Sequence, residues 1–341
     1  MQQEPFDKLD LSENGYASPS FKKGGGGEGF LPRIGPLENW HPPEIPPNLS
    51  QQGFYVGTSG YYFDDWVGLF NPPRLSQKQK QLLDPEQAEA FDRLKFYQRY
   101  FRFIEINSSF YTEPSIQTYI DIEERSRDDS LFSVKANKNV SHSRELDAKK
   151  GAELMKAHIE AVSPLVETGR FYSFLIQLED RNQRSQKALD YLCAVSEPAI
   201  RKRMDVHIEF RHVSWHSEHV LQTLKDNGIG ICNTEIPPVP HAFPLKAYAT
   251  TDKGYVRYSG KNLEHWYAQE KATTSKERIA QRNARYDYNY SEAEIQERAQ
   301  GQQQLAKKTS VVAIAYNNHY KIQAVLNAIY NLQVLKMQLG I

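Results

Sequence analysis

The sequence predicts one eight-stranded parallel (β/α)8 barrel of the TIM type, preceded by a flexible N-terminal extension. Short apolar runs alternate with helical patterns after Gln52, and this alternation extends over the length of about 250 residues that such barrels need. An open doubly wound sheet would carry a GxGxxG turn after its first strand, and the segment Gly57-Thr58-Ser59-Gly60 lacks that spacing. The barrel is therefore the favoured architecture.

The first fifty residues differ in composition from the rest. Four glycines run from Gly24 to Gly27, six prolines follow between Pro32 and Pro47, and no hydrophobic period accompanies them. A phosphate-binding loop is excluded there, because no GK[ST] ending follows and no strand precedes it. We expect residues 1–50 to be a flexible arm and residues 51–341 to form the single barrel domain.

The barrel elements are expected in alternating order. Residues rich in β-branched and aromatic types predict strands at 54–58, 102–107, 131–137, 171–178, 205–210, 229–233, 254–258 and 311–316. Apolar residues three and four apart predict helices at 85–100, 148–162, 185–196, 216–226, 291–308 and 320–336.

Polar side chains recur at the ends of these strands. Side chains alternate between the two faces of a strand, so Glu105 and Asn107 share one face while Ile104 and Ile106 share the other. In a barrel the carboxyl ends of all strands meet at one mouth, where active sites lie. The expected lining is Glu105, Asn107, Lys135, Asn137, Gln177, Glu209, Arg211, Arg257 and Asn317.

The charges of this lining favour a small anionic ligand. Three cations stand against two carboxylates, and guanidinium groups offer a planar fork to phosphate or carboxylate. We expect Arg211, Arg257 and Lys135 to hold such a ligand. Gln177 belongs to the same binding set, and Asn107 and Asn317 would orient the ligand.

Two carboxylates and one imidazole are the candidate catalytic groups. Glu105 and Glu209 have the chemistry of a general acid and base, and His142 could shuttle a proton from the loop after the third strand. Each also has a structural interpretation. The glutamates and arginines could be ion pairs that lock the barrel, and His142 could be a solvated loop residue.

Aromatic residues follow several strands. Tyr61, Trp66 and Trp215 are candidates for a wall that stacks on a sugar or a base, although aromatics at such positions often close a core instead.

Composition limits the remaining possibilities. Lys+Arg and Asp+Glu number 42 each, so the formal net charge of zero provides no chain-wide basic field for nucleic acid. Only Cys193 and Cys232 occur, which excludes a disulfide framework, and no apolar stretch has the length of a membrane span or a signal peptide. We expect a cytoplasmic protein without cofactor or tightly held metal. Magnesium held by Glu105, Glu209 or Glu235 is the alternative.

Several motifs resemble one known family. They are Val56-Gly57-Thr58-Ser59-Gly60-Tyr61, Trp66-Val67-Gly68, Ile104 to Tyr111 followed by Pro114, Lys135-Ala136 with Ser141-His142, Gln177-Leu178, Glu209-Phe210-Arg211-His212 with Ser214-Trp215, Tyr255 to Gly260, and Tyr316-Asn317-Asn318 with Asn327-Ala328. In this order, from about Gly53 to Leu335, the chain resembles the domain of unknown function 72 family.

The resemblance implies a TIM-type barrel and no established reaction. Two departures stand out. Leu178-Glu179 follows Gln177 where the family usually has Phe-Pro, and Asn233-Thr234-Glu235 stands where it often shows an aspartate.

Three classes of function stay open on the sequence. The first is an enzyme that performs hydrolysis, lyase chemistry or isomerisation on a small anionic molecule, because no nucleotide or flavin fingerprint supports redox work. The second is a barrel that binds or processes nucleic acid, with aromatic side chains stacking on bases. The third is a noncatalytic sensor or scaffold.

Overall fold

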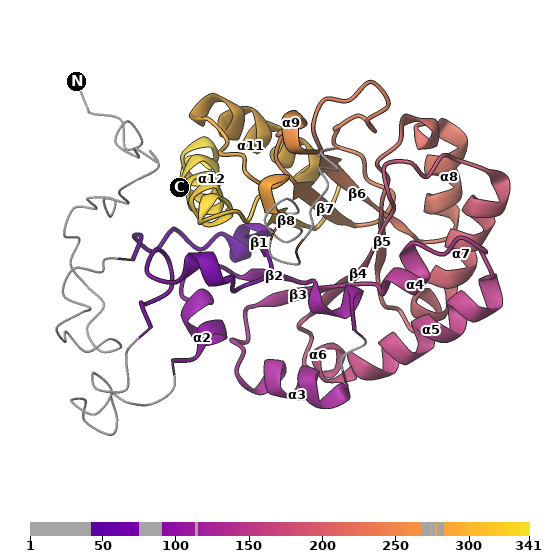
Figure 1. Cartoon of the computed structure of the whole chain (residues 1–341), viewed down its shortest axis with the longest axis horizontal. Coiled ribbons are helices and arrows are strands. Elements are labelled where there is room, and N and C mark those ends of the chain that lie inside the picture. The colour runs from indigo at the N-terminus through magenta and orange to yellow at the C-terminus, as the bar shows by residue number, and fades with distance from the viewer. Residues whose placement is uncertain (1–41, 75–90, 113–114, 267–273, 275–276, 278–282) are drawn as a thin grey trace.

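The computed structural model describes residues 42–74, 91–112, 115–266, 274, 277 and 283–341, and it confirms the predicted barrel. Eight parallel strands close in sequence order, so that β8 pairs with β1. Figure 1 shows the strands together at the centre with the helices around them, and the C-terminus at the end of α12. Residues 1–41 of the predicted arm lie outside the described residues, whereas Leu49, within the expected arm, is buried in the core.

All eight strands lie where the sequence places them. They are β1 Phe54–Ser59, β2 Phe103–Ile106, β3 Leu131–Lys135, β4 Phe171–Gln177, β5 Val206–Glu209, β6 Gly230–Glu235, β7 Lys253–Tyr258 and β8 Val311–Tyr316.

Helices and short turns connect the strands. The helices are α2 Arg93–Tyr97, α3 Ile116–Glu124, α4 Lys138–Ser141, α5 Ala148–Ala161, α6 Ser163–Glu167, α7 Gln186–Arg201, α8 Glu218–Asp226, α9 Leu263–Trp266, α11 Glu292–Ala306 and α12 Gln323–Leu339. Turns of 3₁₀ helix, η2 Ser50–Gln52, η3 Asp64–Trp66, η4 Ser108–Phe110 and η5 Val213–Trp215, lie among them.

Side-chain caps explain where the longer helices begin. Asp147, Ser185 and Ser217 each accept a hydrogen bond from a backbone N–H in the first turn of α5, α7 and α8. Ser291 and Glu294 form a reciprocal capping box at the start of α11. These local signals fix the helix starts within two residues of the sequence prediction, apart from α12, which begins three residues later, and α2. The predicted helix at 85–100 is reduced to α2 within the described residues, and its first part lies outside them.

The two faces of the strands have different surroundings, as the alternation predicts. Ile104, Ile106 and Ile314 face the outer core beneath the helices. Inside the barrel, a separate cluster fills the lumen: Phe103, Tyr172, Leu175, Cys232, Tyr255, Ala313 and Ala315. The lumen below the polar strand ends is therefore packed with side chains and is no pore.

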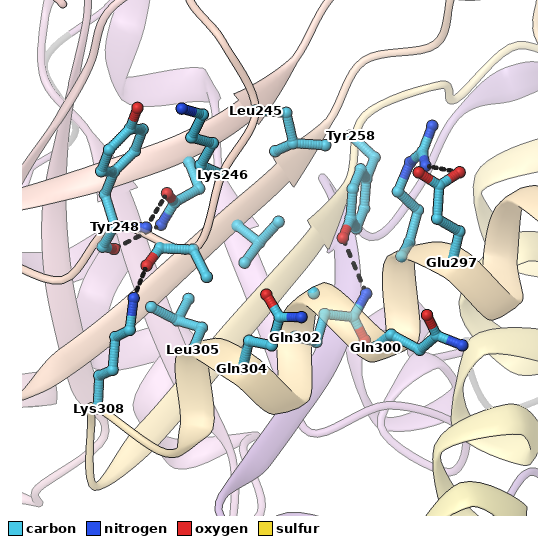
Figure 2. A pocket seen from close by; sticks show the side chains of 15 residues that line it. Leu245, Lys246, Tyr248, Tyr258, Glu297, Gln300, Gln302, Gln304, Leu305 and Lys308 are labelled. Carbon is cyan, nitrogen blue, oxygen red and sulfur yellow. Dashed lines mark hydrogen bonds and ion pairs between the residues drawn. The ribbon is translucent and has the colours of Figure 1, made fainter.

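One βα unit lacks its helix. The connection from β6 to β7, residues 236–252, is described throughout and contains no helical residue. A groove of about 580 Å³ lies there, between the outer face of these strands and α11 (Figure 2). Tyr258 accepts a hydrogen bond from Gln302 Nε2 at 3.0 Å, and Lys308 Nζ donates to the carbonyl of Ala247 at 2.8 Å. The groove lies outside the barrel wall, away from the polar strand ends.

Substitution of two glycines, Gly57 in β1 and Gly301 in α11, should change the stability of the barrel in opposite directions. A Cβ on Gly57 would lie 1.8 Å from the carbonyl oxygen of Phe103 on the neighbouring strand, whereas a Cβ on Gly301 in α11 meets nothing within 4 Å. Gly57→Ala should lower the free energy of unfolding by at least about 3 kcal/mol, because the β1–β2 backbone must separate. Gly301→Ala should raise it by about 0.5–1 kcal/mol through helix propensity. Urea unfolding measures both, and equal effects would contradict the close strand approach.

Candidate functional site

Arg257, on β7, is the centre of the polar strand ends. Its side chain is 1% exposed, and its Nε and Nη2 donate to the two carboxylate oxygens of Glu105 at 2.7 and 2.8 Å. Its Nη1 donates to Glu209 Oε2 at 2.7 Å and to Gln177 Oε1 at 3.2 Å. One guanidinium thus joins β2, β4, β5 and β7, and the convergence expected from the alternation is present.

The charges of this group stabilise one another in the interior. Burial raises the pKa of Glu209, but the positive charges of Arg257 and Arg211 outweigh it and lower the pKa to about 2. Burial likewise raises the pKa of Glu105, and Arg257 holds it below its ordinary value. Burial lowers the pKa of Arg257, while the two glutamates raise it well above the ordinary value. All three groups are ionised at neutral pH.

Tyr255 supports the same cluster from below. Its hydroxyl donates to Glu105 Oε2 at 2.7 Å, so this oxygen accepts from both a phenol and a guanidinium. Tyr255 is not among the lining residues expected from the sequence, although it shares the face of Arg257 two positions along the strand and this alternation could have found it.

Lys135 lies at the end of β3, beside the cluster. Its Nζ donates to Gln177 Oε1 at 2.9 Å and lies 4.2 Å from the ring centroid of Phe110. Burial and the charge of Arg257 lower its pKa to about 7. This lysine is half-buried, unlike the fully buried glutamates.

Arg211 follows β5 and leaves a donor unused. Its Nε donates to Glu209 Oε1 at 2.6 Å, and its guanidinium carbon lies 5.4 Å from the ring centroid of Trp266. Its Nη2 is buried without a hydrogen-bond partner among the described residues. Ser59 Oγ and Asn107 Oδ1, at the ends of β1 and β2, are buried and unpartnered in the same part of the structure. Buried polar atoms without partners are rare, and a bound molecule would satisfy them.

His142 and Asn317 occupy the rim. His142 follows α4, and its ring lies 5.0 Å from that of Phe110, the aromatic ring that Lys135 also contacts. Burial lowers the pKa of His142 to about 4, so the imidazole is neutral at pH 7. Asn317 is buried, and its Nδ2 donates to Ser259 Oγ at 3.2 Å.

The predicted aromatic wall is packed into the protein. Trp66 is fully buried and its Nε1 donates to the carbonyl of His319 at 2.9 Å. Trp215 stacks on Phe210 at 4.8 Å, and its Nε1 donates to the carbonyl of Asn182 at 2.7 Å. Tyr61 is half-buried, edge-on to Tyr97 at 6.4 Å. These contacts give each ring a packing function, and ligand binding by them stays a prediction.

Two further residues lie elsewhere. Asn137 caps α4 by accepting from Asn139 N at 3.0 Å. Glu235 lies on the opposite face of β6 from Cys232 and pairs with Arg298 of α11 at 2.6 Å, behind the barrel wall. This placement separates Glu235 from Glu105 and Glu209.

No group of three or more His, Cys, Asp or Glu side chains in the described part of the chain is arranged to hold a metal ion. None of the helices in the same residues is long and apolar enough to cross a membrane.

A closed parallel barrel with polar side chains converging at the strand ends defines a protein of the TIM-barrel class. A family model described as "Protein of unknown function DUF72" matches residues 55–340, and the chain belongs to this family, as its motifs indicated.

Solved structures agree with this assignment. The chain is similar to a DUF72 family protein from Thermotoga maritima, with 28% identity and a TM-score of 0.64 over 84% of this chain and 99% of that chain. A DUF72 family protein from Enterococcus faecalis V583 shares the fold, with 20% identity and a TM-score of 0.66 over 83% of this chain and 95% of that one. Comparison with curated proteins gives no match.

Removing the central cation should destabilise the protein strongly. Arg257→Met leaves Glu105 and Glu209 buried without this partner, and we expect the free energy of unfolding to fall by about 3–5 kcal/mol. The exposed pair of Lys156 and Glu153 is the control, because Lys156→Met should cost less than about 1 kcal/mol. Urea unfolding of the two variants is the measurement. Similar losses would show that the central ion pairs do not hold the barrel.

The depressed pKa of Glu209 predicts a dependence of stability on pH. A carboxyl whose pKa is lower in the folded chain stabilises the fold above its unfolded pKa, and this contribution disappears as pH falls towards the folded value of about 2. Glu209→Gln should therefore reduce the free energy of unfolding by about 3 kcal/mol at pH 7. The difference from the unsubstituted protein should shrink between about pH 4.5 and pH 2. Chemical denaturation across this range measures it, and a constant difference would refute the assignment.

Proposed function

We propose that the protein binds a small anionic molecule, bearing a phosphate or carboxylate group, at the carboxyl ends of the barrel strands and acts on it by acid–base chemistry. The observation that carries this proposal is the unpartnered Nη2 of Arg211, which is buried beside a cluster of charges. A guanidinium N–H without an acceptor is costly inside a protein, and an anion supplies the acceptor.

The distribution of charge supports the same ligand class. Each of the four carboxylate oxygens of Glu105 and Glu209 already accepts from Arg257 or Arg211. Lys135 adds a third cation, which bonds to a neutral amide instead of a carboxylate. The cluster thus has an excess of positive charge when Lys135 is protonated.

Proton transfer can follow from the binding of the anion. Glu209 is a weak base while Arg257 and Arg211 hold both of its oxygens. An anion that draws Arg211 away removes one of these bonds and raises the pKa of Glu209, so substrate binding would activate the base. His142 and Lys135 lie against the same Phe110 ring and provide further proton acceptors at neutral pH. Hydrolysis, elimination and isomerisation are the reaction classes that fit.

The remaining binding residues have supporting positions in this proposal. Gln177 is held by Lys135 and Arg257, and it would keep the two cations apart at the site. Asn107 presents a free Oδ1, which accepts a hydroxyl or amine donor of the ligand. The buried ion pair of Arg257 and Glu105 fixes the positions of these groups.

Substitution of Arg211 tests the proposal with inorganic phosphate as the probe. Arg211→Lys keeps the charge and loses the planar fork, and we expect the Kd for phosphate to rise at least about tenfold, with a larger rise for Arg211→Gln. Isothermal titration calorimetry measures the Kd, and circular dichroism confirms folding.

A matched control uses the outer groove. Lys246 lines that groove, away from the strand ends, and Lys246→Gln should leave the Kd unchanged. A loss of binding with Lys246→Gln and none with either Arg211 variant would place the anion in the groove and reject the proposal.

A further inference from the structure

We propose that Lys135 forms a Schiff base with a small carbonyl compound that carries an anionic group. This inference rests on the anion site proposed above and adds a covalent step at a particular atom. It also narrows the substrate class to keto or aldehyde compounds that bear a carboxylate or phosphate.

The pairing of Lys135 distinguishes it from the neighbouring cations. Arg257 and Arg211 are both bonded to carboxylates, whereas no carboxylate oxygen of the described residues lies within 4.0 Å of Lys135 Nζ. The protein partners of this amine are the Gln177 carbonyl oxygen and the face of Phe110. An amine desolvated beside other cations is the arrangement in which a lysine becomes a nucleophile.

The groups that surround the amine act mostly to keep it neutral. Burial and the charges of Arg257 and Arg211 lower its pKa, and the carboxylates Glu105 and Glu209 raise it. The neutral imidazole of His142 contacts the same Phe110 ring. The result, a pKa of about 7, leaves a large fraction of free amine at neutral pH.

Schiff-base formation at Lys135 needs an amine nucleophile, a proton relay and the loss of water. The lone pair of Lys135 Nζ attacks the carbonyl carbon, the C=O π bond breaks, and one proton passes from the nitrogen to the oxygen to give a neutral carbinolamine. The C–O bond then breaks, the oxygen leaves as water with one proton from the nitrogen, and a C=N bond forms. The imidazole of His142, which contacts the same Phe110 ring as the amine, would relay these protons. The free Nη2 of Arg211 would hold the anionic end of the substrate.

Reductive trapping tests the inference on the intact chain. The protein is incubated at pH 7 with pyruvate, dihydroxyacetone phosphate or neutral dihydroxyacetone, sodium cyanoborohydride is added, and peptide mapping by mass spectrometry locates the secondary amine. We expect labelling of Lys135 by the two anionic compounds to exceed that of the exposed Lys156 at least tenfold. Labelling should rise through pH 7 and reach its plateau near pH 8, because an amine with a pKa of about 7 is then mostly deprotonated.

The variants separate this inference from the anion site. Lys135→Arg removes the primary amine, so it should lose the adduct at position 135, and phosphate binding is measured on the unsubstituted protein. In Arg211→Gln, dihydroxyacetone phosphate should lose its advantage over dihydroxyacetone. Phosphate binding without any adduct above the Lys156 level would overturn the Schiff base and leave the anion site standing. An adduct formed equally by the charged and neutral ketones in the unsubstituted protein would support the amine and reject the anion site.

Discussion

The buried guanidinium of Arg257 imposes the constraint on which the rest of the site depends. A single charge in the interior of a barrel is tolerated only when it is compensated, and Glu105 and Glu209 approach it from two other strands to do so. Because the glutamates lie on β2 and β5, their bonds to β7 cross the lumen and add to the strand ladder. The ion pairs therefore fix the relative positions of strands that are not neighbours in the sheet.

Because Arg257 binds most of the carboxylate oxygens, Arg211 and Lys135 keep donor groups that are not bonded to a carboxylate. Once Arg257 has taken three carboxylate oxygens, Arg211 takes the fourth with Nε and keeps Nη2 without a partner. Lys135 is left with an amide and an aromatic face. The polar strand ends thus have two layers, an inner one saturated by internal bonds and an outer one with unsatisfied donors, and the proposed chemistry concerns the outer layer.

Local patterns were sufficient to predict the barrel, since each strand is a short buried run bounded by polar residues. The helix α3 was missed because only Tyr119 and Ile122 are buried on it, which is too narrow a stripe to stand out. The absent helix between β6 and β7 coincides with prolines at 237, 238 and 240, a signal in the sequence that predicts loop.

Alternation along the strands likewise predicted that Glu105, Glu209 and Arg257 would meet, but not which atoms would bond. Which side-chain atoms bond depends on the register of the strands and on how far each side chain extends, and neither can be derived from the alternation of residues along one strand. Trp266 reaches Arg211 from the long connection after β7, a contact that spacing along the chain does not reveal.

The aromatic side chains that fill the lumen limit how a ligand could reach the polar strand ends. Phe103, Tyr172 and Tyr255 fill the barrel interior beneath the charged residues, so the lumen offers no passage to the opposite end of the barrel. A ligand of the proposed site would therefore enter and leave past the carboxyl ends of the strands. Exchange of one ligand for another would then require the first to leave before the second could enter.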